Sequence, residues 1–316
     1  MGFESDYFAP SSGVPQGSNL GPLLFLIYIY DLCPKLLYAD DLKLYSTINN
    51  SQDCNHLQSQ LDIFHTWCVN NKLTVNVSKC KIVTYIRKTT PIIYTYHLAG
   101  SSLPRETSMR DLGVVFDSRL TFMEHISSIC TSALSMLGFI IRVTRPFASI
   151  TAILPLYFAF VRSRLEYASL VWSPMYIYQI HLLEQIQRRC LKFLYFKKFN
   201  TYPIQGFSHS ALLEAFNIDS LELRRKQAEC KFLFTLLHNG LDVAELLSKI
   251  NFIVPRSGSR QTNTFYCFAP RTNIAIRSPI HRLCSNFNSM EFAELDIHTC
   301  TLPSLLTLCR PRVRYT

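Results

Sequence analysis

Apolar residues beyond residue 100 recur at the spacing of an α-helix. One such face is formed by Ile126, Ile129, Ala133, Leu137 and Ile140. Residues three or four positions apart share a helix face, so this stretch predicts an amphipathic helix. The segments 153–172, 181–196 and 220–240 continue the pattern, and Gly240 stands where a C′ glycine would end the last of them. An all-helical region is therefore expected.

The first hundred residues predict shorter, mixed elements. Residues 11–22 form a turn-rich loop with glycines and prolines, and the apolar run 23–32 fits a buried helix or a strand equally well. Residues 35–48 read as two short strands that meet in a hairpin, and alternating Val and Ile predict a strand within 72–88. Residues 111–117 predict one more short strand.

An amphipathic helix separates these strands. Leu57, Leu61, Phe64 and Cys68 fall at helical spacing, and the pattern ends near Asn70–Asn71. The elements together predict an α+β chain: a small sheet with two helices, followed by an all-α region.

Composition favours packed globular structure. The hydrophobic fraction is 48% and the aromatic fraction is 13%, values that exclude a disordered chain. The apolar runs are interrupted before the roughly 20 residues that a bilayer span needs, so no membrane partner is expected. The N-terminus lacks a signal peptide, which predicts an intracellular protein whose eleven cysteines are reduced and mostly buried.

The net charge of +10 is unevenly placed. Residues 1–100 carry as many acidic as basic side chains, whereas residues 101–200 carry a net +6 and residues 201–316 a net +4. The positive charge of residues 101–316 favours binding of a polyanion such as nucleic acid. An ordinary solvated basic surface would have the same net charge.

Two neighbouring carboxylates, Asp40 and Asp41, interrupt the strand-like run LLYADDLKLY. Carboxylate oxygens are ligands for hard divalent cations such as Mg²⁺, which in pairs clamp the reacting oxygens of phosphoryl transfer. An isolated Asp-Asp pair is more often a plain polar turn. Other motifs have to decide between these interpretations.

Several motifs accompany the pair in a fixed order: SGVPQG at residues 12–17, YADD, WCVNNKLTVNVSKC and DLGVVFDSRLTFMEHI. Together they resemble the reverse transcriptases of non-LTR retrotransposons, particularly the Jockey-like insect lineages. The resemblance continues through LYFAFVRSRLEYASLVWSP and LEQIQRRCLKFLYF. It implies a partial polymerase palm in residues 1–100, a primer-grip strand and helical thumb in 101–200, and a C-terminal helical region with a basic tail in 201–316.

The resemblance also implies roles for individual residues. Asp40 and Asp41 match the metal-binding aspartates, Lys79 matches a lysine thought to act on departing pyrophosphate, and Leu112 with Gly113 matches a primer grip. The loop with Gly13, Gln16 and Gly17 is similar to one that lies against template and nucleotide. The implied cofactor is Mg²⁺, and the implied partners are an RNA template, a DNA primer and dNTPs.

One family feature is missing from these residues. The first catalytic carboxylate of the family lies on a strand several dozen residues ahead of the SGVPQG loop, and here only twelve residues precede Gly13. Tyr30 also stands where an asparagine is usual, and the link to the hairpin is short. We therefore expect a partial copy that does not polymerise DNA by itself. A non-catalytic nucleic-acid-binding remnant is the alternative.

Two further signals lie in the helical region. Arg188, Arg189 and Lys192 offer phosphate contacts, whereas the interleaved aromatics are expected in the core. The second signal is the group His281, Cys284, His298 and Cys300, whose spacing permits a zinc-containing interaction module. A helix with buried Cys284 fits that segment better, and residues 251–316 otherwise predict a loosely ordered basic tail.

Overall fold

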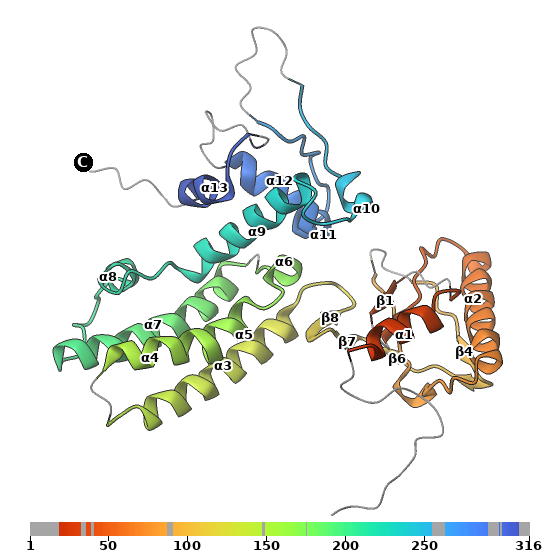
Figure 1. The fold of residues 1–316 in the computed structure, drawn as a ribbon, viewed down its shortest axis with the longest axis horizontal. Helices are drawn as coiled ribbons and strands as arrows, with labels where there is room; N and C mark the ends of the chain where they lie inside the picture. The colour runs from red at the N-terminus through yellow and green to blue at the C-terminus, as the bar shows by residue number, and fades with distance from the viewer. Residues whose placement is uncertain are drawn as a thin grey trace, which may run out of the picture. The chain divides into compact units, whose positions relative to one another are not determined.

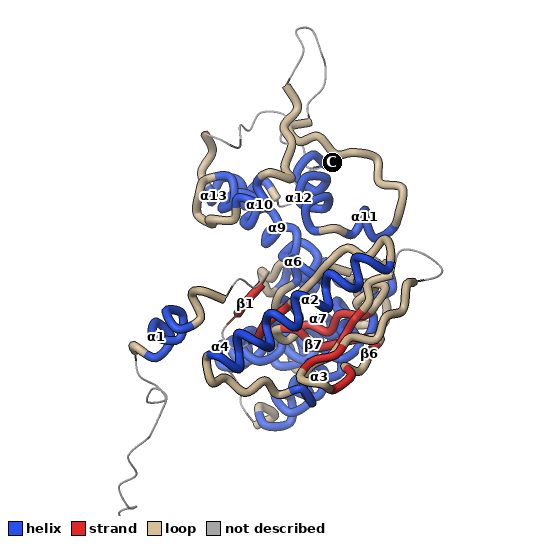
Figure 2. The backbone as a smooth tube through the Cα atoms, turned by 90° about the vertical axis from the view of Figure 1, so that its right-hand side faces the viewer, coloured by secondary structure: helices blue, strands red, loops and turns tan. Residues whose placement is uncertain are grey.

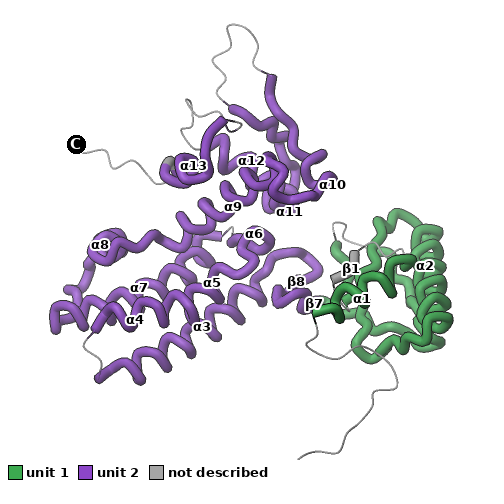
Figure 3. Tube along the Cα trace, viewed as in Figure 1, with its two compact units in different colours: residues 1–107 green, residues 108–316 purple. Residues whose placement is uncertain are grey.

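A computed structural model describes most of the chain. The described residues are 19–32, 36–38, 41–86, 91–146, 149–174, 176–254, 263–289, 297 and 299–309. They divide into two compact units, unit 1 at residues 1–107 and unit 2 at residues 108–316 (Figure 3). Helices dominate and the strands are short and paired in twos (Figure 2), so the α+β class is confirmed. The three-part division at residues 100 and 200 stays a prediction.

Unit 1 is organised around helix α2, Ser51–Asn70 (Figure 1). The Asn50 side chain accepts from the Asp53 amide, and the Asp53 carboxylate accepts from the Asn50 amide, so a capping box begins the helix. Its apolar face packs against Tyr96, Leu98 and Leu103. The predicted helix and its end near Asn70 are confirmed.

The strands of unit 1 form three two-stranded pairs. Strands β1, Leu36–Tyr38, and β2, Asp41–Lys43, are antiparallel; β3, Ile82–Val83, runs parallel to β6, Arg105–Glu106; and β4, His97–Leu98, pairs with β5, Ser101–Ser102. The hairpin predicted at residues 35–48 is confirmed.

The strand predicted within 72–88 is largely wrong. The backbone of Lys72 has a φ of 57°, and the 3₁₀ turn η1, Val77–Lys79, interrupts the alternation. Only Ile82 and Val83 pair, because β6 offers a partner just two residues long. Alternating β-branched residues indicate a pleated surface, but a strand also needs a neighbour along its length.

Unit 2 begins with the hairpin of β7, Ser108–Asp111, and β8, Val114–Asp117, which leads into α3, Met123–Val143. The predicted apolar stripe of α3 is confirmed: Ile126, Ala133, Leu137 and Ile140 are buried. Their partners include Leu183, Leu191 and Leu194 of α7, Ile177–Phe199.

The segment predicted as one helix at 153–172 is divided. It comprises α4, Ile150–Tyr157, the π-helix η2, Phe158–Arg162, α5, Ser163–Glu166, and α6, Ser169–Trp172. Pro155 lacks an amide hydrogen, and the wider η2 turn follows it directly. Ala168 has a φ of 50° and separates α5 from α6. Trp172 is fully buried, as expected.

The remaining helices build a second hydrophobic cluster. They are α8, His209–Ala215, α9, Leu221–Leu237, α10, Ala244–Leu247, α11, Asn273–Arg277, α12, Pro279–Ser289, and α13, Leu302–Leu308. The cluster holds Leu233, Phe265, Phe287 and Leu305. The helix with buried Cys284 that the sequence predicts is confirmed as α12, whereas the tail predicted for the rest of 251–316 is wrong for residues 263–277 and 299–309, which supply core.

Helix α9 ends differently from the prediction. Asn239, with a φ of 55°, takes the left-handed C′ position, and the Gly240 amide donates to the Thr235 carbonyl at 2.8 Å. This is the Schellman arrangement, in which Gly240 is C″. A Cβ on Gly240 would lie 2.5 Å from Thr235 Cγ2, which explains the glycine one position later than expected.

Among the described helices, α3 alone is long and apolar enough to cross a membrane by length and composition. The sequence interpretation, which found no such run, missed it. The buried stripe of α3 packs into the unit 2 core, and core helices of globular proteins pass the same length and composition test.

Candidate functional site

The β1–β2 hairpin positions the candidate metal ligand Asp41. Asp41 is the first residue of β2, is exposed, and lies opposite Tyr38 in the antiparallel register. The register thus places Asp41 at the end of the β1–β2 pair that is nearest to the link between the two strands. Asp40 itself lies outside the described residues, as do Gly13, Gln16 and Gly17.

The donor chemistry fits a hard divalent cation, because Asp41 offers carboxylate oxygens to solvent. The number of ligands is small: within the described ranges, no three His, Cys, Asp or Glu side chains converge. Asp40 and Asp41 would thus hold a metal from one side only. A site for two ions needs a further carboxylate from elsewhere.

Lys79 is the last residue of η1 and its side chain is exposed. Its amide donates to the Asn76 carbonyl at 3.1 Å, and the Cys80 amide donates to the Val77 carbonyl at 3.0 Å. The local turn therefore fixes the backbone and leaves the ammonium group in solvent.

Helix α1, Gly21–Tyr28, resolves the ambiguity of the run 23–32 in favour of a helix, but the helix is not buried. Leu23, Leu24, Leu26 and Ile27 are 46–64% exposed. Tyr28 anchors it by contacting the Trp67 ring edge-on, with centroids 6.3 Å apart. The expectation of a buried element is wrong for these side chains.

Leu112 and Gly113, the candidate primer-grip residues, form the two-residue turn of the β7–β8 hairpin. Their φ angles are 43° and 85°, and a tight hairpin turn of this kind needs positive φ at both positions. Glycine adopts this conformation freely, whereas a leucine is strained there. Backbone strain of this sort concentrates at functional positions.

Tyr167, which the sequence interpretation did not single out, holds this turn. Its hydroxyl donates to the Leu112 carbonyl at 2.9 Å, and a Cβ on Gly113 would lie 3.2 Å from Tyr167 Cε1. The two residues are 55 positions apart in the sequence, so no local pattern reveals the contact.

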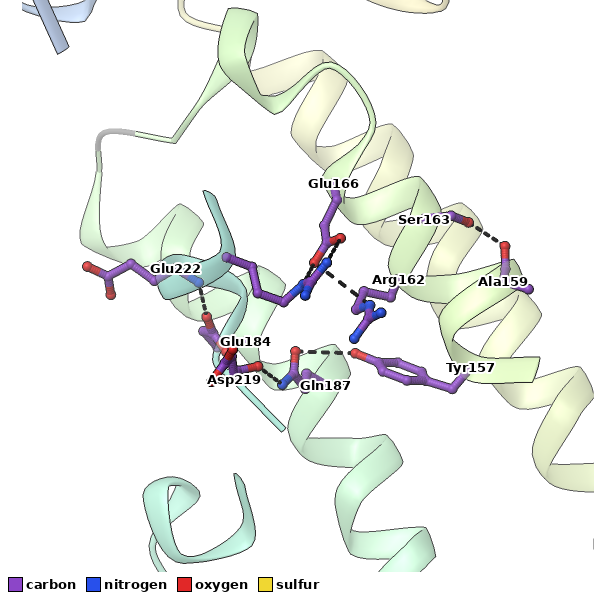
Figure 4. A network of polar contacts seen from close by, with 10 residues as sticks. Tyr157, Ala159, Arg162, Ser163, Glu166, Glu184, Gln187, Asp219 and Glu222 are labelled. Atoms are coloured by element: carbon purple, nitrogen blue, oxygen red, sulfur yellow. Dashed lines mark hydrogen bonds and ion pairs between the residues drawn. The ribbon is translucent and has the colours of Figure 1, made fainter. Parts of the chain in front are cut away.

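An ion-pair network fixes the helix end from which Tyr167 departs (Figure 4). Glu166 accepts from both Nε and Nη2 of Arg224 on α9, the latter at 2.9 Å, and lies 3.9 Å from Arg162 Nε. Hydrogen bonding to Glu166 raises the pKa of Arg224, whereas burial and the neighbouring Arg224 lower the pKa of Arg162.

The other side of the hairpin is tied to the start of α3. The Val115 amide donates to His125 Nδ1 at 3.3 Å, and the His125 ring meets Trp172 edge-on. Burial, with a smaller contribution from Arg110, lowers the pKa of His125, so the neutral ring is favoured.

Asp117 closes the turn between β8 and α3. Its carboxylate accepts from the Arg119 amide, the Thr121 hydroxyl and the Phe122 amide at 2.7–3.0 Å. Burial opposes ionisation, but these hydrogen bonds outweigh it, and the pKa of Asp117 is lowered.

The candidate phosphate-binding residues of α7 differ in their surroundings. Arg189 and Lys192 are exposed, whereas Arg188 is half-buried and donates through Nη2 to the Phe207 carbonyl at 2.7 Å. Phe193 is buried in the unit 2 core, as expected for the interleaved aromatics. Arg188 thus stabilises the loop that follows α7.

The candidate zinc ligands are not brought together as a site among the described residues. Cys284 lies in the second hydrophobic cluster, and burial, with a smaller contribution from Cys267, raises the pKa of its thiol to about 12. Zinc takes the thiolate form, so this environment opposes metal binding. His298 lies outside the described residues.

Comparison with known proteins supports the expected family for part of the chain. The reverse transcriptase (RNA-dependent DNA polymerase) family matches residues 2–141, which contain the β1–β2 hairpin, Lys79 and the Leu112–Gly113 turn. The expected relationship to non-LTR elements is confirmed by individual relatives.

The reverse transcriptase segment is 34% identical over 132 residues to a "Probable RNA-directed DNA polymerase from transposon BS" of Drosophila melanogaster, covering 37% of this chain. It is 29% identical over 142 residues to the RNA-directed DNA polymerase from mobile element jockey of Drosophila melanogaster, covering 40% of this chain. The chain spans 15% of the length of each of these two relatives. No solved structure matches. The family match ends at residue 141, so the resemblance of later segments stays a prediction.

Proposed function

We propose that this chain supplies the metal-binding hairpin and the primer-contacting hairpin of a retroelement reverse transcriptase. The observation that carries the proposal is the β1–β2 hairpin, which presents Asp41 to solvent within residues that match the family. Asp40 and Asp41 would hold Mg²⁺. The ion, when bound, neutralises charge on phosphate oxygens.

Other residues of the chain would contact nucleic acid. Lys79 offers an exposed cation for phosphate, and the loop of Gly13, Gln16 and Gly17 would contact template and dNTP. The Leu112–Gly113 turn would hold the primer end, with Tyr167 as a positioning residue that keeps the strained turn in place. The proposed partners are an RNA template and a DNA primer.

We expect no primer extension by residues 1–316 alone. Among the described residues no cluster of three potential metal ligands includes Asp41, so the metals would lack a ligand that fixes their separation. Catalysis by two metal ions depends on the distance between the ions. Nucleic-acid binding does not require it, since phosphate contacts come from basic side chains.

The test separates binding from chemistry. Template–primer affinity is measured by fluorescence anisotropy with and without Mg²⁺, alongside primer extension. Mg²⁺ should strengthen binding to the native chain and leave Asp40→Asn/Asp41→Asn unaffected, while the control Asp242→Asn, an exposed acid of unit 2, should behave as native. A Mg²⁺ response that survives in the double variant would refute the metal site.

The alternative is a non-catalytic nucleic-acid-binding remnant. The observation that favours it is the basic excess after residue 100, where residues 101–200 alone carry a net +6. Salt-sensitive binding with no response to Mg²⁺ would support the remnant. Extension of the primer by the native chain, abolished in Asp40→Asn, would exclude it.

A further inference from the structure

One end of the unit 2 helical bundle carries basic side chains without acidic neighbours in sequence. Helices α3 and α7 end there together (Figure 1), and the Lys197 ammonium donates to the Arg145 carbonyl across the two chain segments. Residues 125–165 and 185–213, which include both helix ends, contain no Asp or Glu. These two ranges therefore contribute only positive formal charge.

Three cations at this end are available to a ligand. Arg142, Arg145 and Lys198 are exposed, and within the described part of the chain their side chains form no ion pair. Lys197 is different, because its bond to the Arg145 carbonyl helps to hold the two helix ends together. It is left out of the set considered below.

Exposed aromatic rings lie beside these cations. Tyr202 is 62% exposed and stacks on Phe196 with centroids 4.7 Å apart and planes 16° apart. Phe199 is 47% exposed, and the Lys198 ammonium lies 5.2 Å from its ring centroid. An exposed ring already stacked on one face offers its other face to a flat ligand.

We propose that this end of unit 2, the basic tip formed by Arg142, Arg145, Lys198, Phe199 and Tyr202, binds single-stranded nucleic acid. The cations would neutralise backbone phosphates and Tyr202 would stack on an unpaired base, the combination that single-strand binding surfaces use. A duplex shields the faces of its bases, so the aromatic part favours a single strand. All five residues lie beyond the family match at 2–141, and the proposal does not depend on the metal site.

A purely structural role would explain some of the same cations. Basic side chains stabilise helix C-termini, where the backbone carbonyls carry partial negative charge. That role predicts a loss of thermal stability when the cations are removed and no change in ligand affinity. It also gives no reason for Tyr202 to be exposed.

The charge part is tested with a fluorescein-labelled oligo(dT) of about 16 nucleotides, the upper site size of a small single-strand binding fold. Binding is followed by anisotropy in EDTA, so that the proposed Mg²⁺ site has no influence. In Arg142→Gln/Arg145→Gln/Lys198→Gln, the slope of log K against log salt should fall in magnitude by about 2.

The control is Lys226→Gln/Lys231→Gln/Lys249→Gln, which removes the same formal charge from exposed positions elsewhere in unit 2, where Lys226 and Lys249 pair with Glu222 and Glu245. Its salt slope should equal that of the native chain. If the salt slope stays at the native value in both triple variants, or falls by the same amount in both, the proposal is overturned. The three cations would then act only as general surface charge.

The aromatic part is tested with Tyr202→Ala, which should weaken oligo(dT) binding at least about fivefold. Tyr178→Ala is the control, because Tyr178 is also exposed and stacked on a neighbouring ring, Tyr176, at the other end of α7. Equal weakening toward a blunt duplex would overturn the single-strand assignment. Binding of the native chain to anionic lipid vesicles but not to oligo(dT) would overturn the proposal as a whole.

Discussion

Replacing Glu166 with Gln removes a negative charge that pairs with two arginines, Arg162 and Arg224. Glu166 accepts two hydrogen bonds from Arg224 and lies near Arg162, whose pKa is already lowered by burial and by Arg224. Without the carboxylate, both guanidinium groups stay partly buried and repel each other. The perturbation also reaches the hairpin turn, because the next residue, Tyr167, holds the Leu112 carbonyl.

The size of the effect follows from burial. Breaking a buried ion pair costs about 3–5 kcal/mol, and hydrogen bonds to charged groups contribute about 1.5–3 kcal/mol each. The side chains here are 19–31% exposed, which screens the interaction. We expect Glu166→Gln to lower the free energy of unfolding by about 2–3 kcal/mol. For a unit of this size, that lowers Tm by about 4–12 °C.

The assay is thermal unfolding followed by circular dichroism. The double variant Glu166→Gln/Arg224→Gln should be more stable than the sum of the two single changes predicts, because it also removes the Arg224 guanidinium group that loses its carboxylate partner in Glu166→Gln. Arg164→Gln is the control: Arg164 is exposed and bonds only to Ser132, so its loss should cost less than about 0.5 kcal/mol. Additive single changes, or a Glu166→Gln effect as small as that control, would refute the reasoning.

Three further predictions concern the hairpin and α3. Asp117→Ala removes three hydrogen bonds from the turn before α3, and chemical denaturation should show a loss of about 1–3 kcal/mol. His125 has a lowered pKa in the folded state, so its contribution is present above about pH 6.5 and is lost as the pH falls below that value. His125→Gln should therefore lose less Tm than the native chain between about pH 7.5 and 5.5, and an equal drop would contradict this. Leu137→Ala leaves a cavity beneath α3 and should cost about 2–5 kcal/mol, whereas exposed Leu134→Ala should cost little.

The helices were the most predictable part of the fold. Apolar residues at helical spacing located α2 and α3 because one face of each packs on a core, and packing explains why Ile126, Ala133 and Leu137 are apolar. The β1–β2 hairpin was also predicted, since its strands are adjacent in the chain. Two strands that are adjacent in the chain can pair without contacts from distant parts of the sequence.

Three of the errors concern a partner distant in sequence or a missing one. Of the strand predicted within 72–88, the described residues form only Ile82–Val83, because β6 is the short strand that pairs with it. Helix α1 has an apolar sequence but exposed side chains. Part of the predicted C-terminal tail is instead α13, because Leu305 packs against apolar neighbours on α9.

The amino-acid order by itself determined the periodicity of the helices, the hairpin at the paired aspartates and the motif series that marks residues 2–141 as similar to reverse transcriptases. Each of these is a local property, readable within a few dozen residues. Only the tertiary structure decided that Tyr167 holds the strained Leu112–Gly113 turn and that α3 and α7 end together in a basic tip. Those contacts join residues about 50 positions apart, and which of many chemically similar side chains meet is settled by how the helices pack.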